Sequence, residues 1–344
     1  MKRPRILGLG ALAAVAAVAL LAAACGGGSS GSSTPAAGSG GSSGGKVFKI
    51  GLVTDIGGLD DKSFNHLAFV GIQRAKAQLG VDFKVLESHQ ESEYVPNLQT
   101  LASQKYDLVI AVGFLMDGAI KKVAKAYPDV NFAIIDDAPS PALPNVQGLL
   151  FKEQESGYLA GYLAALESKS GIVSTVGGQK IPPVDHYIAG FIAGAKAANP
   201  QVKELNDYSN SFTDTAKCKQ LALNQISQGS DVVFQVAGGC GLGALSAAKE
   251  KGVWGIGVDA DQAYLGDYIL TSAIKKVDVA VFDTIKQVVD GTFQGGGITT
   301  FDAAKGATGL GAVNSAVPQS DIQKLDQQTA QLKSGSITPP DTVS

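Results

Sequence analysis

Arginine is almost absent from this chain of 344 residues, because after Arg5 only Arg74 remains. Sites for phosphate groups, and for the carboxylate of an amino acid, commonly use the planar, two-pronged guanidinium group that arginine alone offers. The scarcity of arginine therefore argues against such ligands. It favours a neutral ligand, or one that lysine holds.

Residues that bind metals or carry out nucleophilic catalysis are also scarce. The three histidines, His66, His89 and His186, are far apart and lack the spacing of a metal site. The sequence contains no Ser-His-Asp arrangement around a nucleophile turn. We therefore expect no metal, no cofactor and no enzyme activity.

Negative charge is in slight excess. The formal net charge is −3, and it becomes −6 once three basic residues near the start, Lys2, Arg3 and Arg5, are set aside. A nucleic-acid partner would require a basic face. We therefore expect no binding of nucleic acid.

The first 45 residues have the pattern of an export signal followed by a tether. A basic head leads into an apolar run over 6–24, Cys25 comes next, and positions 26–45 are almost wholly glycine and serine. We expect a lipoprotein signal peptide over 1–24, a lipid on Cys25 and a flexible tether over 25–45, on the extracytoplasmic face of the cell membrane. A transmembrane anchor is the alternative, because a run of about 19 residues is just long enough to span.

From residue 46 onward, short runs of β-branched residues alternate with helical patterns, which is typical of parallel sheets covered by helices. About 300 residues are too many for one ordinary core and enough for two lobes. The expected strands lie over 49–54, 83–86, 108–112, 132–135, 172–176, 202–208, 232–236, 253–258 and 269–273, and the expected helices over 64–79, 93–104, 116–127, 155–168, 185–198, 214–228, 242–251 and 278–290. The sequence predicts an α/β protein with two doubly wound lobes joined by a hinge. One lobe covers 46–153 plus about 276–300, and the other covers 154–275 plus about 301–344.

Carboxylates, amides, aromatic rings and glycines gather where the predicted strands end. In open parallel sheets the ligand lies beyond the carboxyl ends of the strands, so these positions form the candidate site. They are Asp55, Asp60, Asp61, Phe64, Asn65, Gly113, Phe114, Asp136, Asp137, residues 208–212, residues 238–241 and residues 259–262.

Several short segments between residues 48 and 290 carry a family resemblance. They include Gly51–Asp55, Asp61–Asn65, Gly113-Phe114, Tyr127–Asp136, Glu155–Gly161, Gly190–Gly194, Ser211–Asp214, Ala237–Gly239, Gly257–Gln262 and Thr271–Lys275. Together they resemble the basic membrane protein family of substrate-binding lipoproteins, which includes the purine nucleoside receptor A type. The resemblance implies a type I periplasmic-binding-protein fold that delivers a nucleoside, with purines favoured, to an ABC transporter permease. We also expect a monomer.

The resemblance implies roles for eight residues. Asp55 and Asn65 correspond to the family's base-reading groups, and Phe64 to one wall of its aromatic sandwich. We expect Phe212 to form the opposite wall, with Tyr208 as a substitute. Four further residues expected to contact the ligand are Asp136, Gly238, Asp259 and Lys275, the last two at ribose hydroxyls.

Four of these residues also have a simpler interpretation. Phe64 would otherwise pack in the core, Asp55 would cap a turn, and Lys275 would be a solvated residue at a strand end. Asp259 and Asp261 have the spacing of a calcium pair. A role in ligand binding is favoured for Phe64 and Asp55 by their place at the predicted edge, and for Asp259 because no oxygen-rich loop follows it.

Other functions stay open as alternatives. A sugar-binding lipoprotein of the same fold is the main one, and a nucleosidase that uses Asp55 and Asp61 is a weaker one. A structural surface antigen is a third. The glycines over 238–241 suggest a phosphate loop, but they lack its Lys-Ser/Thr ending.

Cys218 and Cys240 are the two cysteines beyond Cys25, in a chain that we expect to reach oxidising surroundings. Cys218 lies in the first turn of the helix predicted to start near Asp214, and Cys240 follows the strand predicted over 232–236. In a right-handed βαβ unit both positions lie at the same edge of the sheet. We therefore expect a disulfide between them, with two buried thiols as the alternative.

Overall fold

The computed structural model describes residues 46–343. The predicted signal peptide over 1–24, the predicted lipid attachment at Cys25 and the predicted tether over 25–45 lie outside the described residues. Within the part that is described, no helix is both long and apolar enough to cross a membrane.

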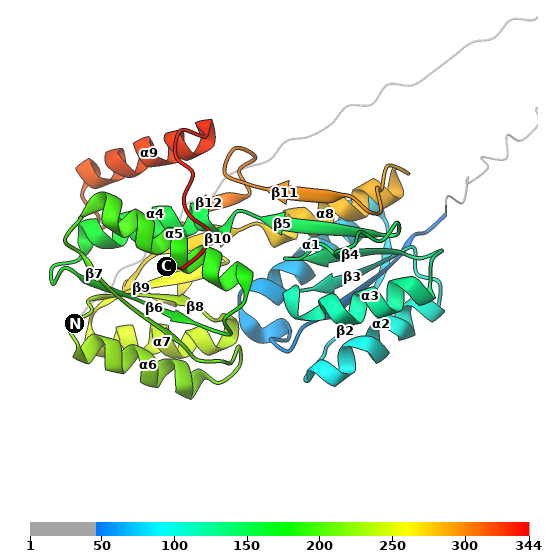
Figure 1. The fold of residues 1–344 in the computed structure, drawn as a ribbon, viewed down its shortest axis with the longest axis horizontal. Coiled ribbons are helices and arrows are strands. Elements are labelled where there is room, and N and C mark those ends of the chain that lie inside the picture. Colours follow the sequence, from blue (N-terminus) through cyan, green and yellow to red (C-terminus); the bar gives the residue numbers. More distant parts are fainter. Residues whose placement is uncertain (1–45, 344) are drawn as a thin grey trace, which may run out of the picture. The chain divides into compact units, whose positions relative to one another are not determined.

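Two six-stranded sheets form the framework of this part of the chain (Figure 1). The first sheet has the order β11-β5-β4-β3-β1-β2, and all of its neighbouring strands are parallel. Its strands are β1 (Lys49–Thr54), β2 (Asp82–Leu86), β3 (Leu108–Val112), β4 (Asn131–Ile135), β5 (Val146–Phe151) and β11 (Ile298–Phe301).

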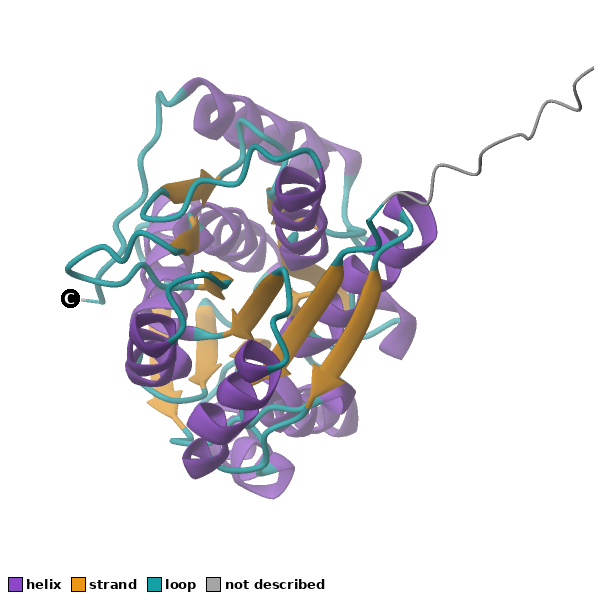
Figure 2. Cartoon of the chain, turned by 90° about the vertical axis from the view of Figure 1, so that its right-hand side faces the viewer, coloured by secondary structure: helices purple, strands orange, loops and turns teal. Residues whose placement is uncertain are grey.

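Helices cover both faces of the first sheet (Figure 2). They are α1 (Phe64–Leu79), α2 (Tyr94–Ser103), α3 (Asp117–Ala126) and α8 (Val277–Val289). Successive side chains of a strand point to opposite faces. Ile50 and Leu52 therefore pack against α1 and α8, whereas Val53 packs against α2 and α3. This double cover explains why the central strands are apolar along nearly their whole length.

The second sheet has the order β12-β10-β9-β8-β6-β7, and only its edge pair, β10 with β12, is antiparallel. Its strands are β6 (Ile172–Gly177), β7 (Lys203–Tyr208), β8 (Val232–Val236), β9 (Trp254–Asp259), β10 (Ile269–Lys275) and β12 (Thr308–Leu310). Helices cover both of its faces. One face is covered by α4 (Glu153–Glu167), α5 (Pro182–Ala198) and α9 (Gln319–Ser334). The other face is covered by α6 (Thr215–Ser227) and α7 (Gly238–Lys251). The predicted α/β architecture with two doubly wound parallel sheets is confirmed.

The chain passes from one sheet to the other three times. The crossings lie between β5 and α4, between β10 and α8, and between β11 and β12. Segments that connect two lobes are where the chain can bend as a hinge. The hinge and the lobe boundaries stay predictions.

The structure differs from the sequence prediction at several elements. Strands β5, β11 and β12 and helix α9 were not predicted, α5 starts at Pro182 instead of 185, and α7 starts at Gly238 instead of 242. In α7 the glycines allow close packing, because a Cβ at Gly241 would lie 1.7 Å from the Gln235 Oε1 atom. The segment predicted as a glycine-rich loop is therefore the first turn of a helix.

Helices α4 and α5 lie in direct backbone contact. A Cβ at Gly161 would lie 1.9 Å from the Phe191 carbonyl oxygen, and one at Gly194 would lie 1.9 Å from the Tyr158 carbonyl oxygen. Only glycine allows two helices to approach so closely. This contact sets the position of α5, whose first turns reach the site described next.

Candidate functional site

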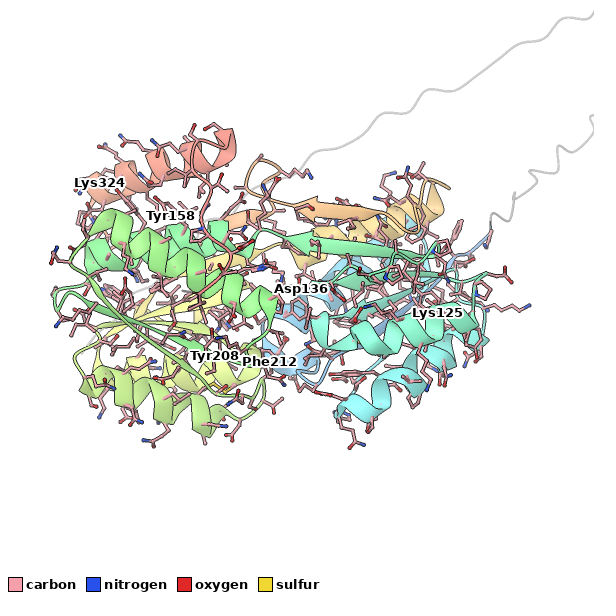
Figure 3. The ribbon with its side chains drawn as sticks, viewed as in Figure 1. Lys125, Asp136, Tyr158, Tyr208, Phe212 and Lys324 are labelled. Atoms are coloured by element: carbon pink, nitrogen blue, oxygen red, sulfur yellow. A yellow bond between two sulfur atoms is a disulfide. The ribbon has the colours of Figure 1, made fainter. Side chains whose placement is uncertain are left out.

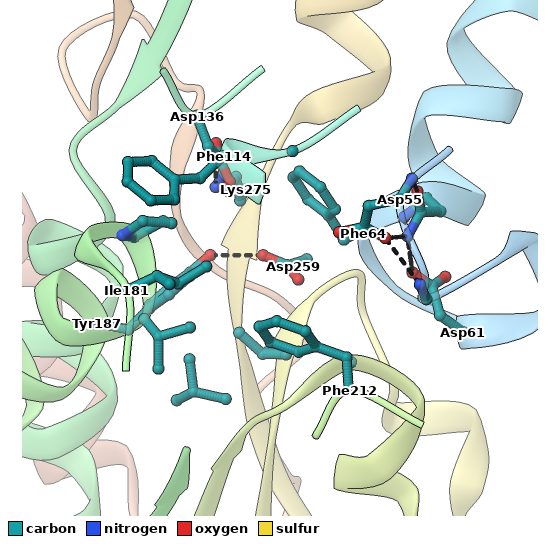
Figure 4. Close-up of a pocket in the computed structure, with 18 residues that line it drawn as sticks. Asp55, Asp61, Phe64, Phe114, Asp136, Ile181, Tyr187, Phe212, Asp259 and Lys275 are labelled. Atoms are coloured by element: carbon teal, nitrogen blue, oxygen red, sulfur yellow. Dashed lines mark hydrogen bonds and ion pairs between the residues drawn. The ribbon is translucent and has the colours of Figure 1, made fainter. Parts of the chain in front are cut away.

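A cavity lies between the carboxyl ends of the two sheets (Figure 4). Its empty volume, including solvent at its mouth, is about 560 Å³. All eight residues that were predicted to contact a ligand line it, namely Asp55, Phe64, Asn65, Asp136, Phe212, Gly238, Asp259 and Lys275. Their roles toward a ligand stay predictions.

Sequence reasoning missed one wall of the cavity. This wall is formed by the start of α5, through Ile181, Pro183, Val184 and Tyr187. The segment was overlooked because it is mostly apolar and because the helix was predicted to begin later. The pair of prolines at the start of α5, directly after the loop that follows β6, was the available signal for a strand-end position.

Asp55 follows β1 and is almost fully buried. Its Oδ1 atom accepts hydrogen bonds from the Gly57 backbone N–H and from the Asn65 Nδ2 amide, both at 2.8 Å. Burial raises the pKa of Asp55 to about 6, although these two hydrogen bonds act in the opposite direction. The carboxyl group is therefore mostly ionised at neutral pH, and it can only accept hydrogen bonds in that state.

Asp61 ends the short helix η1 (Leu59–Asp61) and holds the first turn of α1. Its carboxylate accepts hydrogen bonds from the backbone N–H groups of Ser63, Asn65 and His66 at 2.9, 2.7 and 3.1 Å. Negative charge at a helix N-terminus is stabilising. Asp61 therefore fixes the turn from which Phe64 and Asn65 reach the cavity.

Two of the aromatic rings at the cavity come from opposite sheets. Phe64 is half-buried and packs partly against the core of the first sheet. Phe212 is also half-buried, and its ring lies on Gly178, where a Cβ would be 2.3 Å from the Phe212 Cε1 atom. Tyr208, the predicted substitute, is not among the lining residues, and its hydroxyl donates to Asp185 at 2.5 Å. Figure 3 shows Phe212 and Asp136 where the two sheets meet.

Lys275 is buried in a cluster of acidic groups, so the alternative of a solvated lysine is wrong. Its Nζ atom lies 2.5 Å from the Asp136 Oδ1 atom and 2.8 Å from the Glu153 Oε1 atom. Burial disfavours the ammonium, but the carboxylates of Asp136 and Glu153 outweigh it and raise the pKa of Lys275. The lysine therefore stays charged, and its pair with Asp136 bridges the two sheets.

The two carboxylates of this cluster differ. Burial raises the pKa of Asp136 to about 7, although the Lys275 ammonium opposes the change. Glu153 has a second partner, His186, whose Nδ1 atom lies 3.0 Å from the Glu153 Oε2 atom. Despite its burial, Lys275 and His186 together lower the pKa of Glu153. Asp136 is therefore the carboxylate that takes up a proton more readily.

Asp136 and Asp259 occupy equivalent places, each at the end of its strand, and both have a left-handed backbone with φ of 69° and 61°. Such a conformation is costly for a residue other than glycine, and functional sites are where it concentrates. Asp259 accepts hydrogen bonds from the Tyr187 hydroxyl at 3.0 Å and from the Ser63 hydroxyl at 2.8 Å. Ser63 lies directly before α1, which covers the first sheet, and Asp259 ends β9 of the second sheet. The hydrogen bond between them is therefore another bridge across the cavity.

Cys218 and Cys240 form the predicted disulfide, with their Cα atoms 5.6 Å apart. The alternative of two buried thiols is wrong. The bridge joins α6 to the first turn of α7, and the Cys240 backbone N–H donates to the Phe212 carbonyl at 2.8 Å. The disulfide therefore lies next to the segment that carries the Phe212 ring.

Asp259 and Asp261 do not form the alternative calcium pair. Asp261 accepts hydrogen bonds from the backbone N–H groups of Ala263 at 3.1 Å and Ala312 at 3.0 Å, whereas Asp259 faces Tyr187 and Ser63. Within residues 46–343, no group of three histidine, cysteine or acidic side chains is placed to hold a metal ion.

Comparison with known proteins identifies the family. A family model described as "ABC transporter substrate-binding protein PnrA-like", and called Bmp, matches residues 48–342. The chain belongs to this family. The resemblance noted from the sequence is thereby confirmed, and the protein is a substrate-binding protein of an ABC transporter and not an enzyme.

Two curated relatives of this Bmp-family protein are similar over most of their length. The "CD4+ T-cell-stimulating antigen" of Listeria monocytogenes is 36% identical over 318 residues, which cover 86% of this chain and 89% of that protein. The "ABC transporter nucleoside-binding protein BmpA" of Lactococcus lactis subsp. cremoris is 35% identical over 289 residues, which cover 78% of this chain and 82% of that protein.

A crystal structure of an ABC transporter solute-binding protein from Aeropyrum pernix K1 superposes with a TM-score of 0.78 at 28% identity, covering 85% of this chain and 92% of that one. The fold of this Bmp-family protein is therefore the type I periplasmic-binding-protein fold. In that fold the cavity between two lobes is where a ligand is expected.

Proposed function

We propose that this substrate-binding protein holds a nucleoside, with purines favoured, in the cavity between its sheets and delivers it to the permease of an ABC transporter. The observation that carries the proposal is the mixed lining of the cavity. Two aromatic rings, Phe64 and Phe212, and the Asp55 acceptor line it together with the hydrogen-bonding groups Asp259, Tyr187 and Lys275. A nucleoside combines a flat base with a hydroxylated sugar, so it offers partners to both kinds of group.

Lys275 and Asp259 retain capacity to bind hydroxyl groups of a ligand. Two of the three ammonium hydrogens of Lys275 face Asp136 and Glu153, which leaves one for a ligand. Each oxygen of Asp259 accepts one protein hydroxyl and has room for another donor. A ribose offers hydroxyls that both donate and accept, so it suits both residues.

Charge favours a nucleoside over a nucleotide. Three carboxylates, Asp136, Glu153 and Asp259, surround the single ammonium of Lys275, so a phosphate group would be repelled. Arg74 does not offset this repulsion of a phosphate group, because it is not among the residues that line the cavity. Its guanidinium carbon lies 3.9 Å from the centre of the Phe282 ring. The relative from Lactococcus lactis, whose printed name is nucleoside-binding, supports the same choice.

In the cell, we propose that the mature protein is a monomer held on the extracytoplasmic face by a lipid on Cys25, and that its lobes close on the ligand through the hinge. A sugar-binding protein of the same fold is the alternative. Mass spectrometry of small molecules released from denatured, freshly purified protein tests the choice. A nucleoside supports the proposal, and a free sugar without a nucleoside supports the alternative.

Phe64→Ala is expected to weaken nucleoside binding by about 1–3 kcal/mol, the usual contribution of one base stacked on an aromatic ring. Calorimetric titration measures the affinity, and thermal unfolding without ligand measures stability. Phe132→Ala is the matched control, because that ring is fully buried in β4 and its loss should cost about 3–5 kcal/mol of stability. If Phe64→Ala instead keeps its affinity and loses stability like Phe132→Ala, the alternative of a core residue is right.

A further inference from the structure

We propose that Ser63 is a latch that holds the two sheets of this protein together around the cavity and so slows the dissociation of a bound ligand. Ser63 is not among the residues that line the cavity. The inference rests on the proposed closure of the lobes around a ligand, and it adds the group that keeps them closed. Ser63 is thus a positioning residue that acts without touching the ligand.

The Ser63 hydroxyl reaches from the first sheet's side to the second sheet. Ser63 is fully buried, and its Oγ atom lies 2.8 Å from the Asp259 Oδ2 atom and 3.0 Å from the Val258 carbonyl oxygen. Both partners belong to the end of β9. The single hydroxyl hydrogen therefore lies between two acceptors, one of which is charged, and hydrogen bonds to charged groups are the stronger kind. Separation of the sheets by a few ångströms would break this contact.

The usual role of a serine at this place in a helix is not filled by the Ser63 side chain. Ser63 directly precedes the first turn of α1, where a serine hydroxyl commonly accepts a hydrogen bond from the helix backbone. Within the described residues, its hydroxyl makes no such bond. Asp61 takes this role by accepting from the backbone N–H groups of Asn65 and His66. The Ser63 hydroxyl therefore serves the contact between the sheets instead of the helix.

A second contact joins the same two segments. The Nε2 atom of Gln262, a fully buried side chain, lies 3.5 Å from the Lys62 carbonyl oxygen. Lys62 has a left-handed backbone with φ of 56°, which is costly for a residue other than glycine and concentrates at functional sites. This strained turn presents the Lys62 carbonyl and the Ser63 hydroxyl together to residues 258–262.

Ser63 also lies between two like charges. Its backbone N–H donates to the Asp61 Oδ1 atom at 2.9 Å, and its hydroxyl donates to Asp259, so one residue supplies a hydrogen bond to each carboxylate. The two carboxylates come from different sides of the cavity (Figure 4). Without the hydroxyl, Asp259 would keep only the Tyr187 hydroxyl as a hydrogen-bond donor among residues 46–343. Its repulsion from Asp61 would then favour separation of the sheets.

The test compares Ser63→Ala with the matched control Ser174→Ala. Ser174 is also fully buried and does not line the cavity, but its hydroxyl lies 2.8 Å from the Ser230 Oγ atom and 3.4 Å from the Val232 carbonyl oxygen, both on the second sheet's side. Stopped-flow mixing with guanosine measures the dissociation rate. Ser63→Ala should raise this rate about 10-fold, which corresponds to about 1.4 kcal/mol, and Ser174→Ala should leave it unchanged.

A second readout needs no ligand, because the latch consists of protein groups alone. Small-angle X-ray scattering of protein that has been unfolded, dialysed and refolded measures the radius of gyration. Ser63→Ala should be more expanded than the unaltered protein, since more of its molecules are open, whereas Ser174→Ala should match the unaltered protein. A purely structural role of Ser63 would lower stability without this expansion.

Two results would overturn the inference. One is a Ser63→Ala protein, folded by circular dichroism, whose dissociation rate and radius of gyration equal those of the unaltered protein. The other is equal change in both variants, which would show only the loss of a buried hydroxyl. If the unaltered protein does not bind guanosine, the proposed purine nucleoside function fails, and scattering still decides whether Ser63 holds the sheets together.

Discussion

Replacing Lys275 by methionine is expected to lower the free energy of unfolding by about 3–5 kcal/mol, the usual cost of removing one partner of a buried ion pair. Lys275 is only 1% exposed, and its ammonium lies 2.5 Å from Asp136 and 2.8 Å from Glu153. Without it, these two buried carboxylates lose their shared counter-charge. Denaturant unfolding of the ligand-free protein at pH 7.5 measures the loss.

Two controls separate this effect from loss of side-chain packing. Lys324→Met removes a surface ion pair to Asp321 at 2.7 Å, where the lysine side chain is half exposed, and it should change stability little. Adding Asp136→Asn and Glu153→Gln to Lys275→Met should restore part of the lost stability, because the two carboxylates nearest the removed ammonium then carry no charge, whereas Asp259 keeps its own. A Lys275→Met protein that is as stable as Lys324→Met would show that the cluster does not depend on its lysine.

Gly161→Ala is expected to destabilise the protein by about 1–3 kcal/mol, the usual cost of forcing an extra carbon into a packed interior. The new Cβ would lie 1.9 Å from the Phe191 carbonyl oxygen, so α4 and α5 would have to move apart. Since α5 carries Tyr187 and its neighbours to the cavity, nucleoside affinity should fall as well. Thermal unfolding and calorimetric titration measure the two effects.

Gly118→Ala provides the matched control for this helix contact. Gly118 lies in α3, where a Cβ would meet nothing within 4 Å. Alanine is the better helix former, so this change should stabilise the protein by about 0.5–1 kcal/mol. Equal effects of the two substitutions would contradict the backbone contact between α4 and α5.

Most of the fold could be predicted because its strands are buried on both faces and its helices repeat an apolar pattern. The exceptions have physical causes. Helix α9 has only Leu325 and Leu332 buried, so its sequence shows almost no apolar face. The start of α7 contains glycines at 238, 239 and 241, which are typical of loops when read along the sequence. Only the structure shows that they serve close packing.

The candidate site was predictable to the extent that it follows strand ends. All eight predicted residues line the cavity, and the disulfide was predicted from the same edge argument. What the sequence could not supply is the hydrogen-bond pattern within the site. It does not reveal that Asn65 spends both amide hydrogens on two aspartates, or that Lys275 is shared between Asp136 and Glu153. Such assignments depend on contacts between residues far apart in the chain.

The most direct test of the central claim is a calorimetric comparison of one nucleoside with its nucleotide and with a free sugar. The protein is first unfolded, dialysed and refolded so that no ligand remains from its source. The account predicts that guanosine binds with one-to-one stoichiometry. Guanosine monophosphate and free ribose should bind at least about 10-fold more weakly, a loss of about 1.4 kcal/mol or more in binding free energy. Tight binding of a free sugar without binding of guanosine would contradict it.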